Sequence, residues 1–304
     1  MAKDTIASFY KFTSLKNPKE LRKIATEKAQ DLKLKGTLLL AEEGLNGMIS
    51  GTAENIEAFR VFLGSQKDVG ELRFKLSYYD DVSFRRLLVK VKKEIISIRQ
   101  DLDPTVETGH YLDPLEFEKW YEEGRDMVVL DTRNDYEVAM GTFEGALDPK
   151  IKSFEAFTTY IDEHLENFQG KPIVTFCTGG VRCEKATAYM LKKGMKNVYQ
   201  LDGGIISYFE AMKQLAKEGH WKGECTVFDK RKAITKDLEP SSKQICYVCL
   251  HEMRGEEVAE KEGPGGEICK SCDAKTKASQ GLRQERGKLK AEANQISRKA
   301  HLKE

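Results

Sequence analysis

The residues best suited to covalent chemistry form one loop of six, and they are Cys177, Thr178, Gly179, Gly180, Val181 and Arg182. The loop follows an apolar segment that predicts a buried strand and precedes a helical pattern, so we expect it at the sheet edge where α/β proteins bind ligands. Gly179 and Gly180 permit conformations closed to other residues, which lets the loop N–H groups point inward and bind an anion. Together with the positive charge of Arg182, these groups stabilise a thiolate. We therefore predict that Cys177 is the reactive nucleophile.

Two alternatives stay open at this loop. A buried cysteine at the end of a strand is ordinarily structural, although two glycines and an arginine in the same turn favour reactivity at Cys177. Cys183, directly after the loop, either resolves a persulfide or sulfenate formed on Cys177 or simply begins the next helix.

A second group of cysteines predicts a metal site. Cys246-x2-Cys249 and Cys269-x2-Cys272 are nineteen residues apart, which is the spacing of a zinc ribbon with one tetrahedral structural zinc ion. Free or redox-active thiols are the alternative, and His251 is a possible substitute for one thiolate. Cys225 stands alone and is expected to pack in the core. With seven cysteines and no disulfide pattern, the chain fits a reducing compartment.

Two basic segments indicate a polyanionic partner, although the net charge of +1 indicates none. The first is a predicted strand whose basic residues are Arg85, Arg86, Lys90, Lys92 and Lys93. The second is the tail, where residues 273–304 contain nine Lys or Arg against four acidic residues. A solvated helical tail is the ordinary alternative for the second segment, but the two together favour nucleic acid.

Residues 1–222 predict two domains with different patterns. In residues 1–102, strands are expected at 5–12, 37–41, 46–50, 72–79 and 86–98, and helices at 18–32 and 52–63. This β-α-β-β-α-β order with an extra strand is the ferredoxin-like α+β fold. Residues 103–222 alternate strictly between strands (127–130, 172–176, 198–201) and helices (153–168, 184–193, 205–217), with a helix cap at Asp113, which is typical of a parallel α/β sheet.

Residues 223–304 lose this alternation and are predicted to form a small appendage, zinc-ribbon-like and then helical. The longest apolar runs in the chain, such as 38–41 and 127–130, are only long enough for strands, and the N-terminus lacks the apolar core of a signal peptide. We therefore expect a cytoplasmic protein without a membrane segment.

Residues 108–220 resemble a rhodanese domain. The resemblance is carried by the Cys177 loop, by Asp131-Thr132-Arg133 with Glu137 and Gly141, and by residues 201–204 (LDGG). It implies that Cys177 carries a persulfide and that Arg182 is the loop arginine. For Asp131 and Arg133 it leaves open a catalytic role or a structural ion pair at the strand ends. Rhodanese-like phosphatases need a Cys-x5-Arg loop, whereas this loop is Cys-x4-Arg, so a phosphatase is disfavoured.

The whole chain, from about residue 4 to 250, resembles the bacterial tRNA uridine hydroxylase family. The segments that carry this resemblance are residues 41–47 (AEEGLNG), 177–186 (CTGGVRCEKA) and 227–231 (VFDKR). The family implies oxygen-dependent formation of 5-hydroxyuridine at uridine 34, the wobble position, with tRNA bound at its anticodon region and dioxygen as co-substrate.

The residues alone leave other functions open. A sulfurtransferase that carries a persulfide on Cys177 to tRNA is the main alternative, and an RNA-binding protein with a redox-sensing rhodanese domain is a third. No Gly-x-x-x-x-Gly-Lys-Ser/Thr loop, no Gly-x-Gly-x-x-Gly after a strand and no His-Glu-x-x-His occurs. We therefore expect no nucleotide cofactor.

Overall fold

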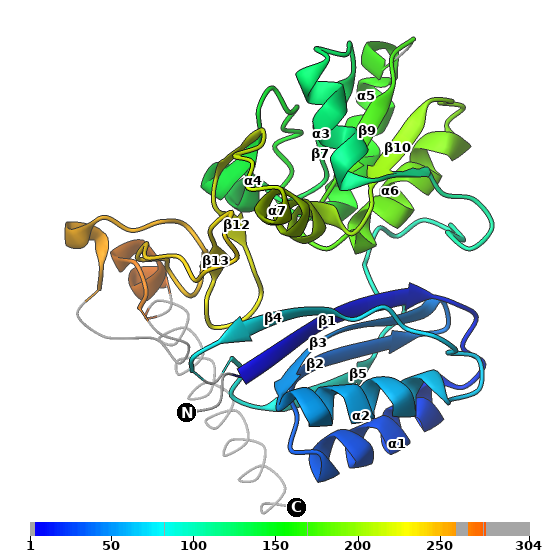
Figure 1. Ribbon diagram of the computed structural model, residues 1–304, viewed down its shortest axis with the longest axis vertical. Coiled ribbons are helices and arrows are strands. Elements are labelled where there is room, and N and C mark those ends of the chain that lie inside the picture. Colours follow the sequence, from blue (N-terminus) through cyan, green and yellow to red (C-terminus); the bar gives the residue numbers. More distant parts are fainter. Residues whose placement is uncertain (1–3, 82, 169, 260–266, 276, 278–304) are drawn as a thin grey trace, which may run out of the picture. The chain divides into compact units, whose positions relative to one another are not determined.

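The computed structural model describes residues 4–81, 83–168, 170–259, 267–275 and 277 (Figure 1). The chain divides into two compact units, Met1–Ser241 and Ser242–Glu304. The first unit contains a five-stranded sheet, a four-stranded parallel sheet and two small two-stranded sheets. The described helices all lack the combination of length and apolar character that a membrane span requires.

The N-terminal domain is a sheet with two helices. Its elements are β1 Asp4–Phe12, α1 Pro18–Asp31, β2 Lys35–Ala41, β3 Gly44–Gly51, α2 Ala53–Gly64, β4 Lys75–Tyr79 and β5 Leu87–Val91. The strand order is β4-β1-β3-β2-β5, with β5 parallel to β2 and the other pairs antiparallel. This order confirms the predicted ferredoxin-like fold with an added edge strand. The strand predicted over 86–98 is shorter, because β5 ends at Val91.

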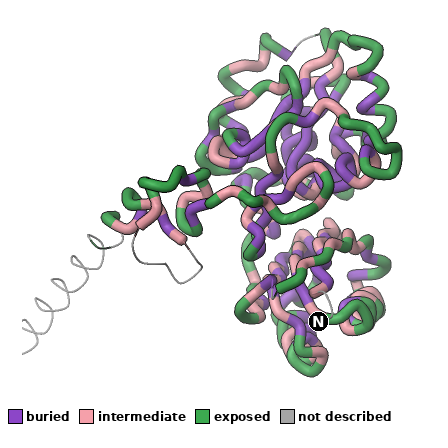
Figure 2. Tube along the Cα trace, turned by 60° about the vertical axis from the view of Figure 1, so that its left-hand side comes forward, coloured by how far each residue is buried: buried purple, intermediate pink, exposed green. Residues whose placement is uncertain are grey.

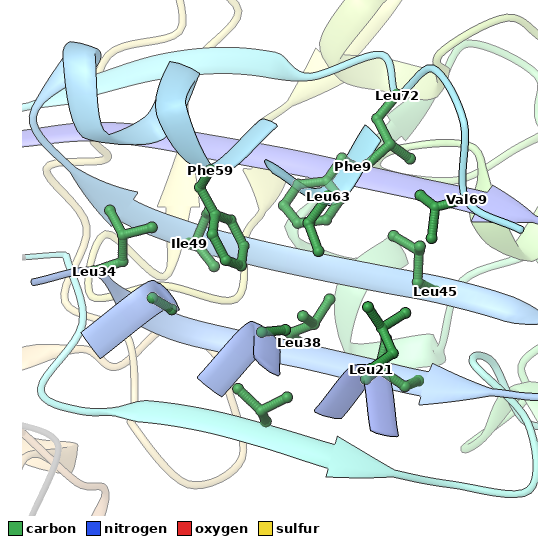
Figure 3. Packing of buried hydrophobic residues seen from close by; sticks show 14 of the residues in the cluster. Phe9, Leu21, Leu34, Leu38, Leu45, Ile49, Phe59, Leu63, Val69 and Leu72 are labelled. Atoms are coloured by element: carbon green, nitrogen blue, oxygen red, sulfur yellow. The ribbon is translucent and has the colours of Figure 1, made fainter. Parts of the chain in front are cut away.

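Helices α1 and α2 cover one face of this sheet. Pro18 at the first helical position and the Asn17 side chain, which accepts from the Glu20 N–H (3.1 Å), fix the start of α1. Figure 3 shows the resulting core, in which Leu21, Phe59 and Leu63 pack with strand residues such as Leu38 and Ile49. Alternate strand residues face away from the helices and include Ser8, Tyr10, Thr37, Leu39, Asn46 and Met48. Neither α1 nor α2 covers this second face, which is therefore available to form a site.

The second domain has a parallel sheet, as the alternating pattern predicts, and its strand order is β6-β10-β9-β7. Its main elements are β6 His110–Leu112, α3 Pro114–Glu122, β7 Val128–Asp131, α4 Asp135–Met140, α5 Phe157–Glu163, β9 Ile173–Phe176, α6 Val181–Lys192, β10 Val198–Leu201 and α7 Gly204–Gln214. One core cluster joins α3 and α7 to the sheet, and another joins α5 and α6. Figure 2 shows the buried residues concentrated inside this domain. The helices therefore cover both faces, as a parallel sheet requires.

Some elements differ from the predicted ones. The helix predicted over 153–168 is divided into the 3₁₀ helix η1 Phe154–Ala156, α5, and the 3₁₀ helix η2 Leu165–Phe168. At the end of α5, the His164 N–H donates to the Ile161 carbonyl three residues back, which tightens the turn between α5 and η2. The short strands β8 Gly141–Phe143 and β11 Trp221–Gly223 pair antiparallel and were not expected.

Residues 223–241 pack with the parallel α/β domain. The strands β12 Cys225–Thr226 and β13 Ala233–Ile234 pair with each other, and Cys225, Val227 and Ile234 belong to the core cluster of α3 and α7. The sequence placed these residues in the C-terminal appendage because their pattern is irregular. The domain limits 1–102, 103–222 and 223–304 are thus a proposal that rests on changes in the sequence pattern alone.

Candidate active site

Cys177 lies between the end of β9 and the start of α6. Gly180 adopts a left-handed conformation (φ 104°), and its N–H donates to Cys177 Sγ (3.1 Å). The N–H of Ile205 donates to the Cys177 carbonyl, which attaches the loop to the first turn of α7. A Cβ atom at Gly204 would lie 2.3 Å from that carbonyl oxygen. The glycines are therefore needed both to form the loop and to let α7 approach it.

The loop favours a thiolate at Cys177. Burial by itself raises the pKa of this thiol, but four groups outweigh burial and lower the pKa well below its usual value. These groups are the Cys183 thiol, which donates a hydrogen bond, the positive charge of Arg182, and the backbone N–H groups of Arg182 and Gly180. In Cys183, burial and the neighbouring negative sulfur raise the pKa well above its usual value. These two shifts favour the thiolate form at Cys177 and the thiol form at Cys183.

The partner of Arg182 is Glu137, in α4. The guanidinium donates Nη1–H to Oε2 (2.6 Å) and Nη2–H to Oε1 (2.8 Å) of a carboxylate that is fully buried. Burial raises the pKa of Glu137, but the charges of Arg182 and Arg133 outweigh it and lower the pKa below its usual value. The sequence predicted that the positive charge of Arg182 helps to stabilise the thiolate. Its charge does act on Cys177, but the fork of its guanidinium binds Glu137.

Asp131 and Arg133 form a second buried pair, at the end of β7. Arg133 donates Nε–H and Nη2–H to the two carboxylate oxygens (2.9 and 2.7 Å), and both side chains are fully buried. Arg133 also donates to the Gly141 carbonyl (2.6 Å), and Asp131 accepts from Thr142 (2.9 Å). These contacts tie β7 to β8, which favours the structural one of the two roles that the sequence left open.

A cavity of about 420 Å³ opens beside the Cys177 loop. Its wall on the N-terminal side is the uncovered face of the five-stranded sheet, with Phe84 and Ile96. The opposite wall is formed by Cys177, Thr178, Gly179, Val181, Arg182, Glu137, Asn134, Tyr136, Ser153, Phe154, Ile206 and Phe228. Cys177 therefore lines a space to which both domains of the first unit contribute.

Lys75, in β4, also touches the loop and was missed in the sequence. Its Nζ donates to the carbonyls of Gly179 (2.7 Å) and Gly203 (2.6 Å). Burial lowers the pKa of Lys75 to about 8, while the nearby charge of Cys177 acts in the opposite direction. A lysine in a short strand with alternating exposure looks like a surface residue, so no sequence signal pointed to this contact.

The family motifs of the two domains meet in buried polar contacts. Lys185, fully buried in α6, binds Glu43 (2.7 Å) and Glu94 (2.7 Å) of the N-terminal domain. The adjacent Glu184 accepts hydrogen bonds from Tyr10 (2.9 Å) and Tyr111 (2.9 Å) on either side. These contacts join the N-terminal domain to the helix that follows the Cys177 loop.

The basic residues of the predicted strand lie apart from this cavity. Arg85, Arg86, Lys90, Lys92 and Lys93 are all exposed. They lie on or beside β5, an edge strand that pairs only with β2, and none of them lines the cavity at Cys177. The basic tail from residue 278 onward is outside the described residues.

The four cysteines of the second unit come together. The Sγ atoms of Cys246, Cys249, Cys269 and Cys272 all lie within 4.8 Å of one another, and Cys249 and Cys269 are 3.9 Å apart. Four sulfurs around one zinc ion at about 2.3 Å would be about 3.8 Å apart, so the cluster fits the ion. His251 is exposed, and its ring lies 3.1 Å from the Cys249 carbonyl.

Cys225 lies in the first unit and does not belong to this cluster. Burial raises the pKa of its thiol to about 12, as expected for a thiol packed in a core.

Comparison with known proteins agrees with both domains. Residues 5–95 match the family model "UPF0176 acylphosphatase like domain", and residues 113–211 match "Rhodanese-like domain". A rhodanese-like domain from Anabaena is 18% identical over 37% of this chain and 78% of that chain, with a TM-score of 0.31.

Full-length relatives cover almost the whole chain. The tRNA uridine(34) hydroxylase of Acinetobacter baumannii is 38% identical over 90% of this chain and 86% of the relative. A protein of the same name from Picosynechococcus sp. is 38% identical over 88% of this chain and 89% of the relative. Both the identity and the coverage confirm the resemblance found in the sequence. The chain belongs to the tRNA uridine(34) hydroxylase family.

Proposed function

We propose that this protein hydroxylates uridine 34 of tRNA to 5-hydroxyuridine in an oxygen-dependent reaction in the cytoplasm. The observation that carries the proposal is that Cys177 lines a cavity to which both domains contribute, in a loop whose N–H groups and arginine favour the thiolate. A folded duplex does not fit a cavity of about 420 Å³, but a single base from an anticodon loop does.

Dioxygen is the proposed source of the added oxygen atom. Inserting one oxygen atom into the C5–H bond leaves the second atom to be reduced to water, which takes two electrons and two protons from an external donor. Cys177 would act on the substrate or on an oxygen species as a thiolate, since this is its nucleophilic form.

A sulfurtransferase is the second candidate, and the Cys-x4-Arg loop with its lowered thiol pKa favours it. On this reading Cys177 carries a persulfide, and the outer sulfur is transferred to tRNA. The two activities give different products, 5-hydroxyuridine or a thionucleoside. An RNA-binding redox sensor would give neither.

Nucleoside analysis of tRNA from cells lacking this protein tests the proposal. We expect the loss of 5-hydroxyuridine and its derivatives at position 34 and their return when the gene is restored. Unchanged wobble nucleosides in the deletion strain would contradict the proposed activity.

We further propose that the exposed basic residues along β5 bind the tRNA backbone. Changing Lys90, Lys92 and Lys93 together to Ala should weaken tRNA binding and reduce the slope of log K against log salt by about 2–3, since each phosphate contact contributes about 0.7–0.9. Changing Lys119, Lys171 and Lys196 to Ala, which are exposed lysines of the second domain, removes the same charge and is the control. Equal salt slopes for the two triple variants would contradict this assignment.

For the second unit we propose one structural zinc ion held by Cys246, Cys249, Cys269 and Cys272. The ion would cross-link the two Cys-x-x-Cys segments, which have few apolar residues to hold them together. Elemental analysis should give about one zinc per chain. A Cys249→Ser variant should lose most of this zinc, whereas Cys225→Ala should keep it. Purified protein without zinc and with four freely titratable thiols in this segment would contradict the proposal.

A further inference from the structure

We propose that the cavity beside Cys177 receives one extruded uracil base, with Phe228 stacked on the ring and Asn46 accepting a hydrogen bond from N3–H. The inference rests on the proposed function, and it assigns the residues that hold and select the base. Phe228 and Asn46 come from two of the three segments that carry the family resemblance, and neither has a role in the thiolate loop.

The shape of the site requires an extruded base. Cys177 is almost fully buried and is reached through a cavity of about 420 Å³, which is near the lower end of the usual 300–1,000 Å³ range for small-ligand sites. A base stacked within a loop or helix would keep its ring atoms away from the sulfur. Enzymes that modify a base in a polynucleotide solve this problem by taking the base out of its stack.

Phe228 has the properties of a stacking platform. Its ring lines the cavity and is 53% exposed, while Val227 before it is buried. Directly after it, the buried Asp229–Arg231 pair (2.9 and 2.6 Å) fixes the backbone, and the Lys230 N–H donates to the Ser83 carbonyl of the N-terminal domain. Because the neighbouring residues are buried and rigid, the exposed Phe228 ring offers a flat stacking surface, and ordering it on binding costs little entropy. Phe84 and Tyr136 line the same cavity and add aromatic surface.

Asn46 is oriented by its neighbour. Its Nδ2 donates to the Ile95 carbonyl (3.3 Å), and because a carbonyl can only accept, the amide cannot be turned around at this contact. The backbone at Ile95 is also held on its other side, since the Ile95 N–H donates to Glu43 Oε1 (2.6 Å). Asn46 Oδ1 has no hydrogen-bond partner among the described residues, and the side chain lines the cavity. The site thus presents a fixed acceptor.

A fixed acceptor distinguishes uracil from cytosine. Uracil has a donor at N3–H between two carbonyls, whereas cytosine has a lone pair at N3. The lone pair would face the Asn46 oxygen without a hydrogen bond, which is the costly outcome in a desolvated site. Ser8 and Thr37, on the same sheet face, supply hydroxyl groups that can donate to the uracil carbonyls.

The stacking part is tested by binding. The probe is an anticodon stem–loop RNA with uridine, cytidine or an abasic site at position 34, and the readout is Kd. For the wild-type protein we expect uridine to bind roughly tenfold more tightly than the abasic site. Phe228→Leu should remove most of this difference, and Phe228→Tyr should keep it. Tyr78→Leu, which removes an exposed aromatic ring outside the cavity, is the matched control.

The selective part is tested with Asn46→Ser. Wild-type protein should prefer uridine over cytidine by roughly tenfold, and the variant should lose most of this preference. Equal binding of all three RNAs by wild-type protein would overturn the proposed subsite, as would base-dependent binding that Phe228→Leu leaves intact.

The binding measurements test the subsite independently of the proposed hydroxylase activity, because binding needs no turnover. Protein that binds the uridine probe in this base-dependent manner without hydroxylating it would refute the activity and support the subsite. Protein that hydroxylates with the same kcat/KM in Phe228→Leu as in wild type would support the activity and refute the subsite.

Discussion

Changing Cys177 to Ser is expected to abolish 5-hydroxyuridine formation and leave the fold intact. The loop N–H groups and Arg182 stabilise a negative charge on sulfur, and a serine hydroxyl is not ionised at neutral pH even with this help. Loss of an essential nucleophile lowers turnover by at least roughly 10⁴-fold. The measurement is the 5-hydroxyuridine content of tRNA in a deletion strain that carries the variant gene. The far-ultraviolet circular dichroism of purified variant protein checks the fold.

A Cys183→Ser variant is the matched control, since it changes the neighbouring buried thiol. If Cys183 only begins α6 and donates a hydrogen bond to Cys177, a serine hydroxyl can donate in its place and the variant should keep most of its activity. If Cys183 resolves an oxidised or persulfidated Cys177, the variant should fail as well. Normal modification in the Cys177→Ser strain would contradict the assigned nucleophile, whatever Cys183 does.

Changing Arg182 to Met is expected to damage both stability and reactivity. The change leaves the Glu137 carboxylate buried without its partner, and breaking a buried pair in this way costs about 3–5 kcal/mol of unfolding free energy. It also removes the positive charge that helps to lower the pKa of Cys177, so the thiolate should form only at higher pH. Denaturant unfolding measures the first effect. Thiolate absorbance against pH, with Cys177→Ser as the blank, measures the second.

The double variant Arg182→Met, Glu137→Gln separates the two effects. Neutralising residue 137 removes the unpaired charge and should restore much of the lost stability. It restores no positive charge at Cys177, so the raised thiol pKa and the low activity should persist. A double variant that recovers wild-type activity would show that Arg182 serves stability alone.

The main elements were predictable from the sequence because each depends on residues close together in the chain. The Cys177 loop is six consecutive residues, and the four-cysteine cluster is two short motifs. The strands of the N-terminal domain follow from alternating apolar residues, and the parallel sheet follows from the continuously apolar strands of the second domain. In each case the spacing of neighbouring residues is enough to predict the loop, the metal-ligand motif or the strand.

The partners of the site residues could not be predicted in the same way. Glu137 binds Arg182 across 45 positions, and Lys185 reaches Glu94 across 91. Lysines are usually on the surface, yet Lys75 and Lys185 make their contacts in the interior of the first unit. Only the packing of the two domains tells which charged side chains are buried and paired.

Labelling with heavy-isotope dioxygen tests the central claim most directly. Purified protein or growing cells are supplied with the labelled gas, and position 34 of tRNA is analysed as nucleosides. The label separates hydroxylation from sulfur transfer, which adds nearly the same nominal mass. We predict one labelled oxygen atom in the wobble uridine and no product without oxygen. An unlabelled thionucleoside that forms equally well without air would contradict the hydroxylase function.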